Sequence, residues 1–167
     1  MNGEKLKKTI TAFAFFVAMT VVAFLVVWYA RGPTLTQHYG MYEVITVSEE
    51  SNLVIKKPDG ERRVHLIGVS AEECSKKERK AATKYVKKLT LGKEVSIEYD
   101  RRKTSNGIID FVYMYLADGR MINALLLSEG YADYGNVYGN TRYEKQLKAL
   151  RNEAKSEKKG IWKGEEE

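Results

Sequence analysis

The chain has 167 residues, of which 44% are hydrophobic and 11% aromatic, and it carries a formal net charge of +6. This composition excludes a wholly disordered protein, and the length predicts one modest domain with an appendage. Four basic residues and one acidic residue flank an apolar stretch near the N-terminus, which leaves 24 basic and 21 acidic residues for the domain. So small an excess gives only weak support for nucleic-acid binding. The single cysteine, Cys74, excludes an intramolecular disulfide.

The apolar stretch covers residues 10–30 and contains no charge. At about 1.5 Å rise per residue, a helix of this length crosses a hydrocarbon core of about 30 Å. Trp28 and Tyr29 stand at its end, where aromatic rings favour the membrane interface. A cleaved signal peptide is the alternative, but its apolar core is usually shorter, about 7–15 residues. We therefore predict an uncleaved transmembrane signal anchor.

The basic residues around this stretch predict its orientation. Lys5, Lys7 and Lys8 precede it, whereas Arg31 alone follows it closely. The positive-inside rule then predicts a cytoplasmic N-terminus at 1–9 and an extracytoplasmic domain in a single-pass membrane protein. Residues 31–41 form a predicted linker, residues 42–164 the domain, and residues 165–167 an acidic tail.

The predicted domain begins with strands. Residues 42–47 and 53–57 are rich in β-branched and apolar side chains, and a third strand follows the turn at Gly60 and ends near Val69. Residues 93–100 alternate, with apolar and polar side chains on opposite faces, which predicts a half-buried strand. Asn106-Gly107 predicts a hairpin that leads into a fifth strand at 108–116.

Three helices are predicted. The first runs from Ala71 to about Leu91, with Ser70 as its N-cap and Glu73 as the capping-box partner. The second covers 122–129, and the third begins after Thr141, where Glu144 completes a second capping-box pattern. Five strands and three helices predict an α+β domain on a closed or nearly closed barrel, compatible with a five-stranded OB-fold.

Four sequence blocks resemble those of staphylococcal-nuclease-like (thermonuclease) domains. Residues 60–73, GERRVHLIGVSAEE, resemble the family segment G-E-x-V-R-L-x-G-I-D-A-P-E. Residues 93–100 resemble the family strand G-K-x-V-x-L-E-x-D, residues 113–132 the block Y-V-Y-L-x-D-G-x-x-V-N-x-x-L-V-x-x-G-Y-A, and residues 154–162 the closing A-x-x-x-x-x-G-I-W. The blocks run in order from about Tyr42 to Gly164, and the resemblance implies the OB barrel.

The resemblance also implies a catalytic site, which this sequence does not reproduce. Active members hold one Ca²⁺ with carboxylates and use two arginines and a glutamate to hydrolyse a phosphodiester. Ser51 and Ser70 stand where metal-binding carboxylates are expected, and His65 and Ile109 (or Ile108) where the arginines are expected. Only Glu73 matches the family's general base. Because losing one charge-stabilising donor costs about 10²–10³ in rate, we expect no nuclease turnover and no bound cofactor.

Other residues are weaker candidates, each with a structural alternative. Glu49 and Glu50 are candidate metal ligands, although adjacent acids in a turn are usually solvated. The lysines of the first helix could contact phosphates or simply form a solvated face, and Tyr134 and Tyr138 could stack on a ligand or pack against the core. The lysines in question are Lys80, Lys84, Lys87 and Lys88.

Taken together, the sequence predicts a membrane-anchored, catalytically inactive nuclease-like domain that acts as a binding or scaffolding module for a protein or a polyanion. Two alternatives remain open. One is a non-hydrolytic nucleic-acid-binding module. The other is a metal-dependent phosphodiesterase, with Ca²⁺ as its metal, whose rebuilt site would draw on Glu49, Glu50, Glu73, His65, Arg62, Arg63, Arg101 and Arg102.

Overall fold

A computed structural model describes residues 40–48 and 52–164 of this chain. The predicted membrane anchor, Glu49, Glu50, Ser51 and the acidic tail lie outside these residues. Within the described residues, no helix has both the length and the apolar character needed to span a bilayer. The prediction of an anchor at residues 10–30 therefore stays a prediction.

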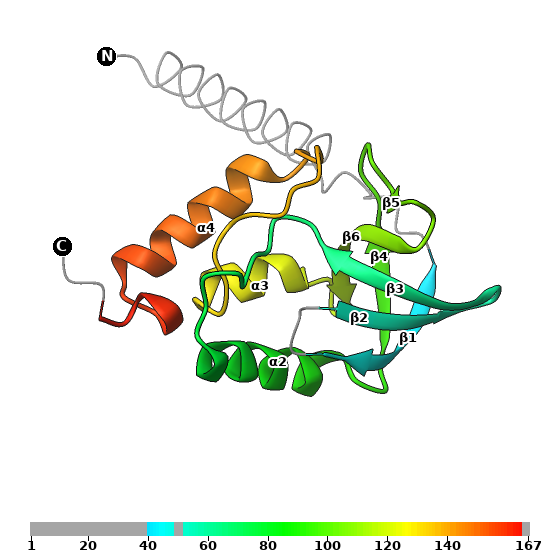
Figure 1. Cartoon of the computed structure of the whole chain (residues 1–167), viewed down its shortest axis with the longest axis horizontal. Coiled ribbons are helices and arrows are strands. Elements are labelled where there is room, and N and C mark those ends of the chain that lie inside the picture. Colours follow the sequence, from blue (N-terminus) through cyan, green and yellow to red (C-terminus); the bar gives the residue numbers. More distant parts are fainter. Residues whose placement is uncertain (1–39, 49–51, 165–167) are drawn as a thin grey trace, which may run out of the picture. The chain divides into compact units, whose positions relative to one another are not determined.

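Five strands close into a barrel (Figure 1). The hydrogen-bonded order is β3-β2-β1-β4-β6, and β3 pairs in parallel with β6 to close the circle. All other pairings are antiparallel, and a short strand, β5, forms a hairpin with β6. The strands are β1 (Met41–Val47), β2 (Asn52–Lys57), β3 (Gly60–Leu66), β4 (Glu94–Glu98), β5 (Thr104–Ser105) and β6 (Ile109–Leu116).

Three helices cover the barrel, as predicted (Figure 1). Helix α2 (Lys76–Thr90) runs along one end of the barrel, beside β1. Helix α3 (Ile122–Ser128) packs between β6 and α4 (Glu144–Ser156). A 3-10 turn, η1 (Gly160–Trp162), follows α4. The α+β class and the five-stranded barrel are confirmed.

The core fills the barrel and continues under α3. Alternate side chains of the strands point inward, and Val44, Ile55 and Val64 have no exposed surface. Each buried side chain of this size contributes about 1.5–3 kcal/mol relative to an exposed one. Asn123 is also fully buried, and its amide accepts a hydrogen bond from Met114 N at 3.0 Å and donates one to Ile67 O at 2.9 Å. It thereby fixes α3 to the closing strand of the barrel.

Four sequence predictions are wrong in detail. The first helix begins at Lys76, because the capping box is formed by Ser75 and Glu78 rather than by Ser70 and Glu73. Strand β3 ends at Leu66, because the chain turns at Gly68, whose φ is +78°. Strand β4 is buried on both faces, although the sequence predicted a half-buried strand. Helix α4 has no side-chain cap in its first turn, although Thr141 and Glu144 predicted a capping box.

Two glycines allow the C-terminal turn to dock on the end of α3. Ile161 N donates to Gly130 O at 2.8 Å, which brings two backbone segments into contact. A Cβ atom on Gly160 would lie 1.9 Å from Gly130 O, and one on Gly130 would lie 2.4 Å from Lys159 O. Only glycine fits at either position, and this explains the Gly-Ile-Trp block at the end of the domain.

Candidate functional site

His65 lies at the end of β3, between Asn52 of β2 and Phe111 of β6. Its imidazole is half-buried, and burial lowers its pKa, although the carboxylate of Glu72 acts in the opposite direction. The ring is therefore neutral at neutral pH. A neutral imidazole cannot supply the fixed positive charge that an arginine would give at this position.

Tyr138 covers this part of the barrel. Its ring stacks on Phe111 with centroids 4.0 Å apart and meets the edge of His65 at 5.4 Å. The guanidinium carbon of Arg102 lies 5.6 Å from the centre of the Phe111 ring. We call His65, Phe111 and Tyr138 the aromatic cluster. It occupies the edge of the β3–β6 pair to which the sequence assigns the two lost arginines.

The backbone that carries Tyr138 is strained. Tyr138 has φ +52° and Asn136 has φ +51°, both in the left-handed region. A bulky residue rarely adopts this conformation, which costs about 1–2 kcal/mol for an L-amino acid. Such strain persists only where surrounding contacts over-determine the loop, and it is concentrated at functional sites.

Contacts with the segment after β3 hold this loop in place. Ser70 and Asp133 exchange two backbone hydrogen bonds of 2.9 Å, and Gly68 N donates to Asn136 O at 3.4 Å. A Cβ on Gly135 would lie 2.8 Å from Ser70 Cβ, so the two segments are in close contact. Both backbone polar groups of Ser70 are thus used in holding the loop, and its hydroxyl accepts from Glu72 N at 3.4 Å.

Glu73 does not have the capping role predicted for it. Helix α2 begins three residues later, where Ser75 N donates to Glu78 Oε2 at 2.7 Å and lowers the pKa of that carboxyl. Glu73 is exposed and lines a cleft between the 70–78 segment and the loop that carries Tyr134. Glu72, Glu78 and Asp133 line the same cleft, which is therefore acidic.

A Ca²⁺ site needs oxygen ligands, because this hard cation takes six to eight of them, mostly from carboxylates. The residues from 52 to 164 and from 40 to 48 contain no group of three acidic, histidine or cysteine side chains placed to hold a metal. Ser70 offers a hydroxyl where a carboxylate would be needed. The described residues therefore do not fit the metal that the family resemblance implies, while Glu49, Glu50 and Ser51 lie outside them.

Ile109 is the first residue of β6 and pairs with Arg63 of β3 and Ser105 of β5. Its alkyl side chain cannot donate to a phosphate. The predicted Asn106-Gly107 hairpin is confirmed, with φ values of +52° and +71°. Arg62 donates to Gly107 O at 2.6 Å and so stabilises the hairpin.

Cys74 is buried near this cleft, and burial raises the pKa of its thiol, with nearby carboxylates acting in the same direction. Cys74 is therefore a small buried side chain and has none of the surroundings that favour a reactive thiolate.

The candidate tyrosines Tyr134 and Tyr138, and the nearby Tyr131 and Tyr143, have separate partners and do not form one surface. Tyr131 stacks on Tyr85 of α2 at 4.5 Å, and Tyr143 meets Tyr113 edge-on at 4.7 Å. Tyr134 lies under the ammonium group of Lys148, 5.2 Å from the ring centre. Tyr138 alone belongs to the aromatic cluster. The lysines at 80, 84, 87 and 88 lie elsewhere, on the exposed face of α2.

Sequence reasoning missed a buried polar network on the β4–β6 pair. Glu98 is 1% exposed and accepts from the hydroxyls of Tyr115 at 2.8 Å and Tyr143 at 2.9 Å. Arg142, from the loop before α4, pairs with the same carboxylate and with Asp100. We call this the Glu98 network. Its members are up to 45 residues apart, so no local spacing in the sequence could have revealed it.

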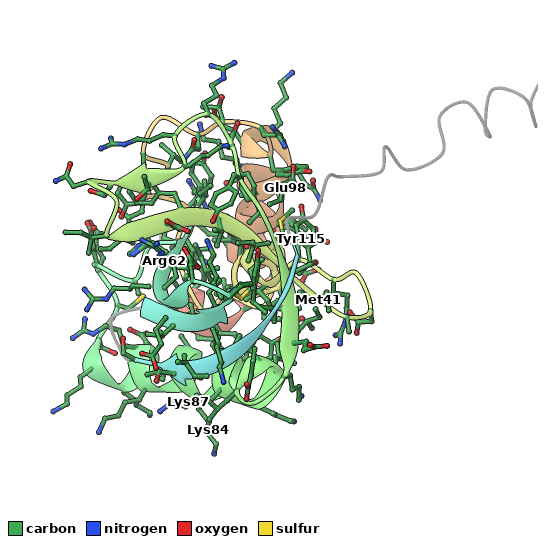
Figure 2. The ribbon with its side chains drawn as sticks, turned by 90° about the vertical axis from the view of Figure 1, so that its right-hand side faces the viewer. Met41, Arg62, Lys84, Lys87, Glu98 and Tyr115 are labelled. Atoms are coloured by element: carbon green, nitrogen blue, oxygen red, sulfur yellow. The ribbon has the colours of Figure 1, made fainter. Side chains whose placement is uncertain are left out.

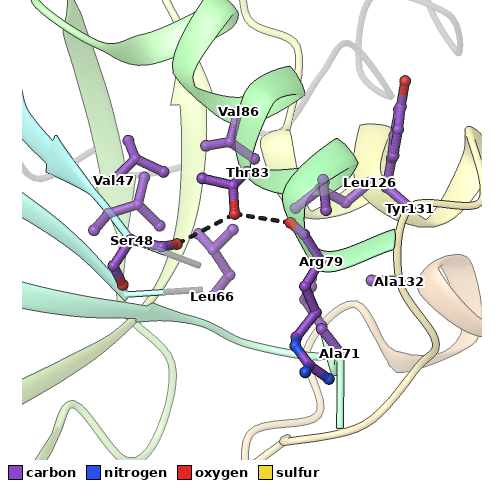
Figure 3. Close-up of a pocket in the computed structure, with 13 residues that line it drawn as sticks. Val47, Ser48, Leu66, Ala71, Arg79, Thr83, Val86, Leu126, Tyr131 and Ala132 are labelled. Atoms are coloured by element: carbon purple, nitrogen blue, oxygen red, sulfur yellow. Dashed lines mark hydrogen bonds between the residues drawn. The ribbon is translucent and has the colours of Figure 1, made fainter. Parts of the chain in front are cut away.

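A small cavity separates α2 from the barrel (Figure 3). It has a volume of about 20 Å³, enough for a single water molecule, and its walls are mainly apolar. Thr83 Oγ1 in this wall donates to Arg79 O at 2.8 Å. The cavity holds no candidate catalytic group and is a packing defect.

Comparison with known proteins agrees with the barrel geometry. Residues 63–164, more than half of the chain, match the family described as "Staphylococcal nuclease homologue". An uncharacterized endonuclease of Escherichia coli is 30% identical over 100 residues, and the SPbeta prophage-derived endonuclease YokF of Bacillus subtilis is 36% identical over 114 residues. These alignments cover 60% and 66% of this chain, but only 62% and 35% of the two relatives. The chain thus spans less than two thirds of either relative.

Proposed function

Because the chain belongs to the staphylococcal nuclease homologue family, we propose that it is a membrane-anchored domain that uses the nuclease fold to bind rather than to cleave. The ligand is a protein or a polyanion, and no cofactor takes part. The apolar residues 10–30 supply the anchor, with the N-terminus in the cytoplasm and the domain outside. Neither the anchoring nor the loss of hydrolysis follows from family membership, so each needs its own test.

The aromatic cluster is the observation that supports binding without cleavage. Phosphodiester hydrolysis needs fixed positive charge beside the phosphate, usually arginine in bidentate contact, as negative charge develops. Here a neutral imidazole and an isoleucine hold those positions, and Tyr138 packs over the imidazole. Tyr138 has a strained backbone and stacks on Phe111, and the Arg102 guanidinium lies 5.6 Å from the centre of the Phe111 ring. This arrangement suits a planar or anionic ligand better than it suits proton transfer.

A second candidate, metal-dependent hydrolysis, has two observations in its favour. The relatives named above are called endonucleases. In addition, the carboxylate of Glu72 acts to raise the pKa of His65, against the larger lowering by burial, so the two groups interact electrostatically. This pair is different from the Glu73 general base that alignment alone suggests.

Cleavage assays distinguish the two candidates. The full chain is incubated with single-stranded DNA in the presence of Ca²⁺, Mg²⁺, Mn²⁺ or Zn²⁺, and with chelator. We expect no cleavage under any condition. Metal-dependent cleavage that disappears in Glu73→Gln or Glu72→Gln, but persists in Glu94→Gln, would sink the binding proposal. Glu94 is a matched control because it is an exposed glutamate on β4.

A binding assay on the same DNA tests the non-hydrolytic nucleic-acid alternative. Binding that weakens steeply with salt, and weakens further in Tyr138→Ala, would identify nucleic acid as the polyanion. Binding that is absent at low salt would leave a protein as the ligand.

Anchoring is tested separately by fractionation. We expect the full chain to remain in the membrane after an alkaline wash, and to leave it when residues 10–30 are deleted. Mass measurement of the membrane-bound form reports whether the segment is retained. A form that lacks residues 1–30 would contradict the uncleaved anchor without affecting the binding proposal.

A further inference from the structure

The positive charge of the domain is concentrated on one helix. Helix α2 carries seven basic side chains and one acidic side chain. Subtracting these from the 24 basic and 21 acidic residues of the domain leaves 17 basic and 20 acidic residues for the remainder. The small overall excess therefore conceals a strongly basic helix on an otherwise slightly acidic domain.

The lysines of this helix face solvent. Lys84 and Lys87 point away from the body of the domain (Figure 2), and both are exposed. Among the described residues, no acidic side chain forms an ion pair with any lysine of α2. The exposed lysines of the helix are Lys76, Lys77, Lys80, Lys84, Lys87 and Lys88.

The C-terminal end of α2 contacts the middle of β1, the first strand of the domain. Gly92 N donates to Val44 O at 2.8 Å, and Val44 N donates to Lys93 O at 3.0 Å. Met41, the first residue of β1, is three residues before Val44, or about 10 Å along the strand. The ten residues that separate Met41 from the apolar stretch span at most about 35 Å. The length of this segment therefore limits how far Met41 can lie from the end of the apolar stretch.

Apolar side chains accompany the lysines there. Three large hydrophobic side chains of the described residues are exposed, and two of them, Met41 (48%) and Leu91 (45%), are at this end. Lysines mixed with exposed apolar side chains are typical of surfaces that lie in a membrane interface. We call Met41, Lys84, Lys87, Lys88, Leu91 and Lys93 the tether-side surface.

We propose that the tether-side surface binds the anionic headgroups of the bilayer in which the chain is anchored, and so orients the barrel relative to that membrane. Each lysine near an anionic leaflet adds modest attraction, and the tether keeps the local headgroup concentration high, so weak contacts suffice. The inference rests on the proposed anchoring, but not on the loss of catalysis.

Nucleic acid fits this surface less well. Single-strand binders combine a basic groove with exposed aromatic rings for stacking. The only aromatic residue of α2, Tyr85, is already stacked on Tyr131, and the aromatic cluster belongs to another part of the barrel. Favourable interaction with the helix dipole accounts for Lys87 and Lys88 in the last turn, but not for the exposed Met41 and Leu91.

The test uses the full chain with vesicles of phosphatidylcholine alone or mixed with phosphatidylglycerol. Flotation measures association, and amine-reactive labelling with mass spectrometry measures the exposure of each lysine. We expect Lys84, Lys87, Lys88 and Lys93 to label about 10-fold more slowly on the anionic vesicles, and high salt to abolish this protection. Lys145, exposed on α4, should label equally on both and is the internal control.

Variants sharpen the test. Lys87→Gln/Lys88→Gln should remove most of the protection at Lys84 and Lys93, whereas Lys76→Gln/Lys77→Gln, with the same charge change at the other end of α2, should leave it. Circular dichroism verifies that both variants are folded.

The results distinguish failure of the proposed lipid-binding surface from failure of the proposed membrane anchor. Flotation with both vesicle types and unchanged labelling overturns the inference and leaves the anchoring intact. Flotation with anionic vesicles alone supports the inference and contradicts the anchoring, and no flotation contradicts both. Protection by added single-stranded DNA, without protection by lipid, overturns the inference in favour of a nucleic-acid surface.

Discussion

The Glu98 network and the aromatic cluster are two regions of one barrel, and they differ in the charged side chains that they contain. In the network, a carboxylate that is 1% exposed accepts from two tyrosine hydroxyls and pairs with Arg142. In the aromatic cluster, the positions that the family resemblance assigns to arginines hold His65 and Ile109. The network holds an ion pair that joins the loop before α4 to the barrel, whereas His65 and Ile109 carry no fixed charge.

The physical reason is that replacing a charged side chain destabilises the fold more in the buried network than at a partly exposed position. Removing one member of a buried network leaves its partners without hydrogen bonds, and this destabilises the fold. Exchanging a partly exposed arginine for an apolar or neutral group leaves no orphaned partner and allows tighter packing. A binding domain can therefore lose the second kind of charge without losing its structure, but it cannot lose the first.

The largest expected effect follows from Glu98→Ala. The variant should lower the free energy of unfolding by about 3 kcal/mol, because Tyr115 loses the carboxylate that accepts its buried hydroxyl and Arg142 loses one of its two carboxylate partners. Urea unfolding at neutral pH measures the change. Glu94→Ala, at an exposed position of the same strand, should stay within about 0.5 kcal/mol of the parent. Equal losses in the two variants would contradict a structural role for the network.

Tyr138→Ala should destabilise the domain less, by about 1–2 kcal/mol, through loss of the stacked pair with Phe111. Alanine at φ +52° keeps the backbone strain, whereas Tyr138→Gly removes it. The glycine variant should therefore be about 1 kcal/mol more stable than the alanine variant. Thermal unfolding of both checks this order, and the reverse order would mean that the loop is not strained.

At alkaline pH, stability should fall because of Tyr99. Burial and the hydrogen bond to Asp110 raise its pKa to about 12, so the unfolded chain loses the phenolic proton first. The stabilisation is present below the ordinary pKa of about 10 and is lost as the pH rises from 10 towards 12. Tyr99→Phe should reduce this decline. Denaturant midpoints between pH 9 and about 12 measure it, and an unchanged slope in the variant would assign the decline to other groups.

The smallest effect concerns His65. Because burial lowers its pKa in the folded state, the unfolded chain binds a proton first as the pH falls. Its contribution is present above the ordinary pKa of about 6.5 and is lost as the pH falls through the lower folded value. His65→Gln should make stability less dependent on pH in this window. A steeper acid decline in the variant than in the parent would be the contrary result.

The sequence predicted most of the fold because local rules and long-range packing agree along most of the chain. Asn106-Gly107 favours the positive φ values of a hairpin turn, and both residues adopt them. The apolar side chains of the predicted strands fill the barrel interior. The predicted helix start at Ser70 is wrong because the sequence contains two possible capping boxes within ten residues, one at Ser70 and one at Ser75. The backbone bonds of Ser70 to Asp133 decide the competition, and they join segments 63 residues apart.

The candidate site was predicted only in part. The positions of His65, Ser70 and Ile109 could be found from their order in the chain, because the first two lie within the block at 60–73 and the third lies between the blocks at 93–100 and 113–132. The cover provided by Tyr138 could not be found, since it depends on how the 133–138 loop docks on the segment after β3. The sequence likewise predicted that the strand at residues 93–100 is exposed on one face. It could not show that Glu98 is buried, because the partners of this carboxylate are distant in the chain.

The sequence by itself determined the α+β class, the five-stranded barrel, the family and which residues stand at the positions that the family resemblance assigns to catalysis, because these depend on patterns within short segments. The tertiary structure alone decided which polar groups are buried, that Glu98 is part of the core, and that the C-terminal end of α2, with its exposed lysines, contacts β1. Burial and pairing are properties of segments that meet in space, and their partners lie too far apart in the chain for any local pattern to record them.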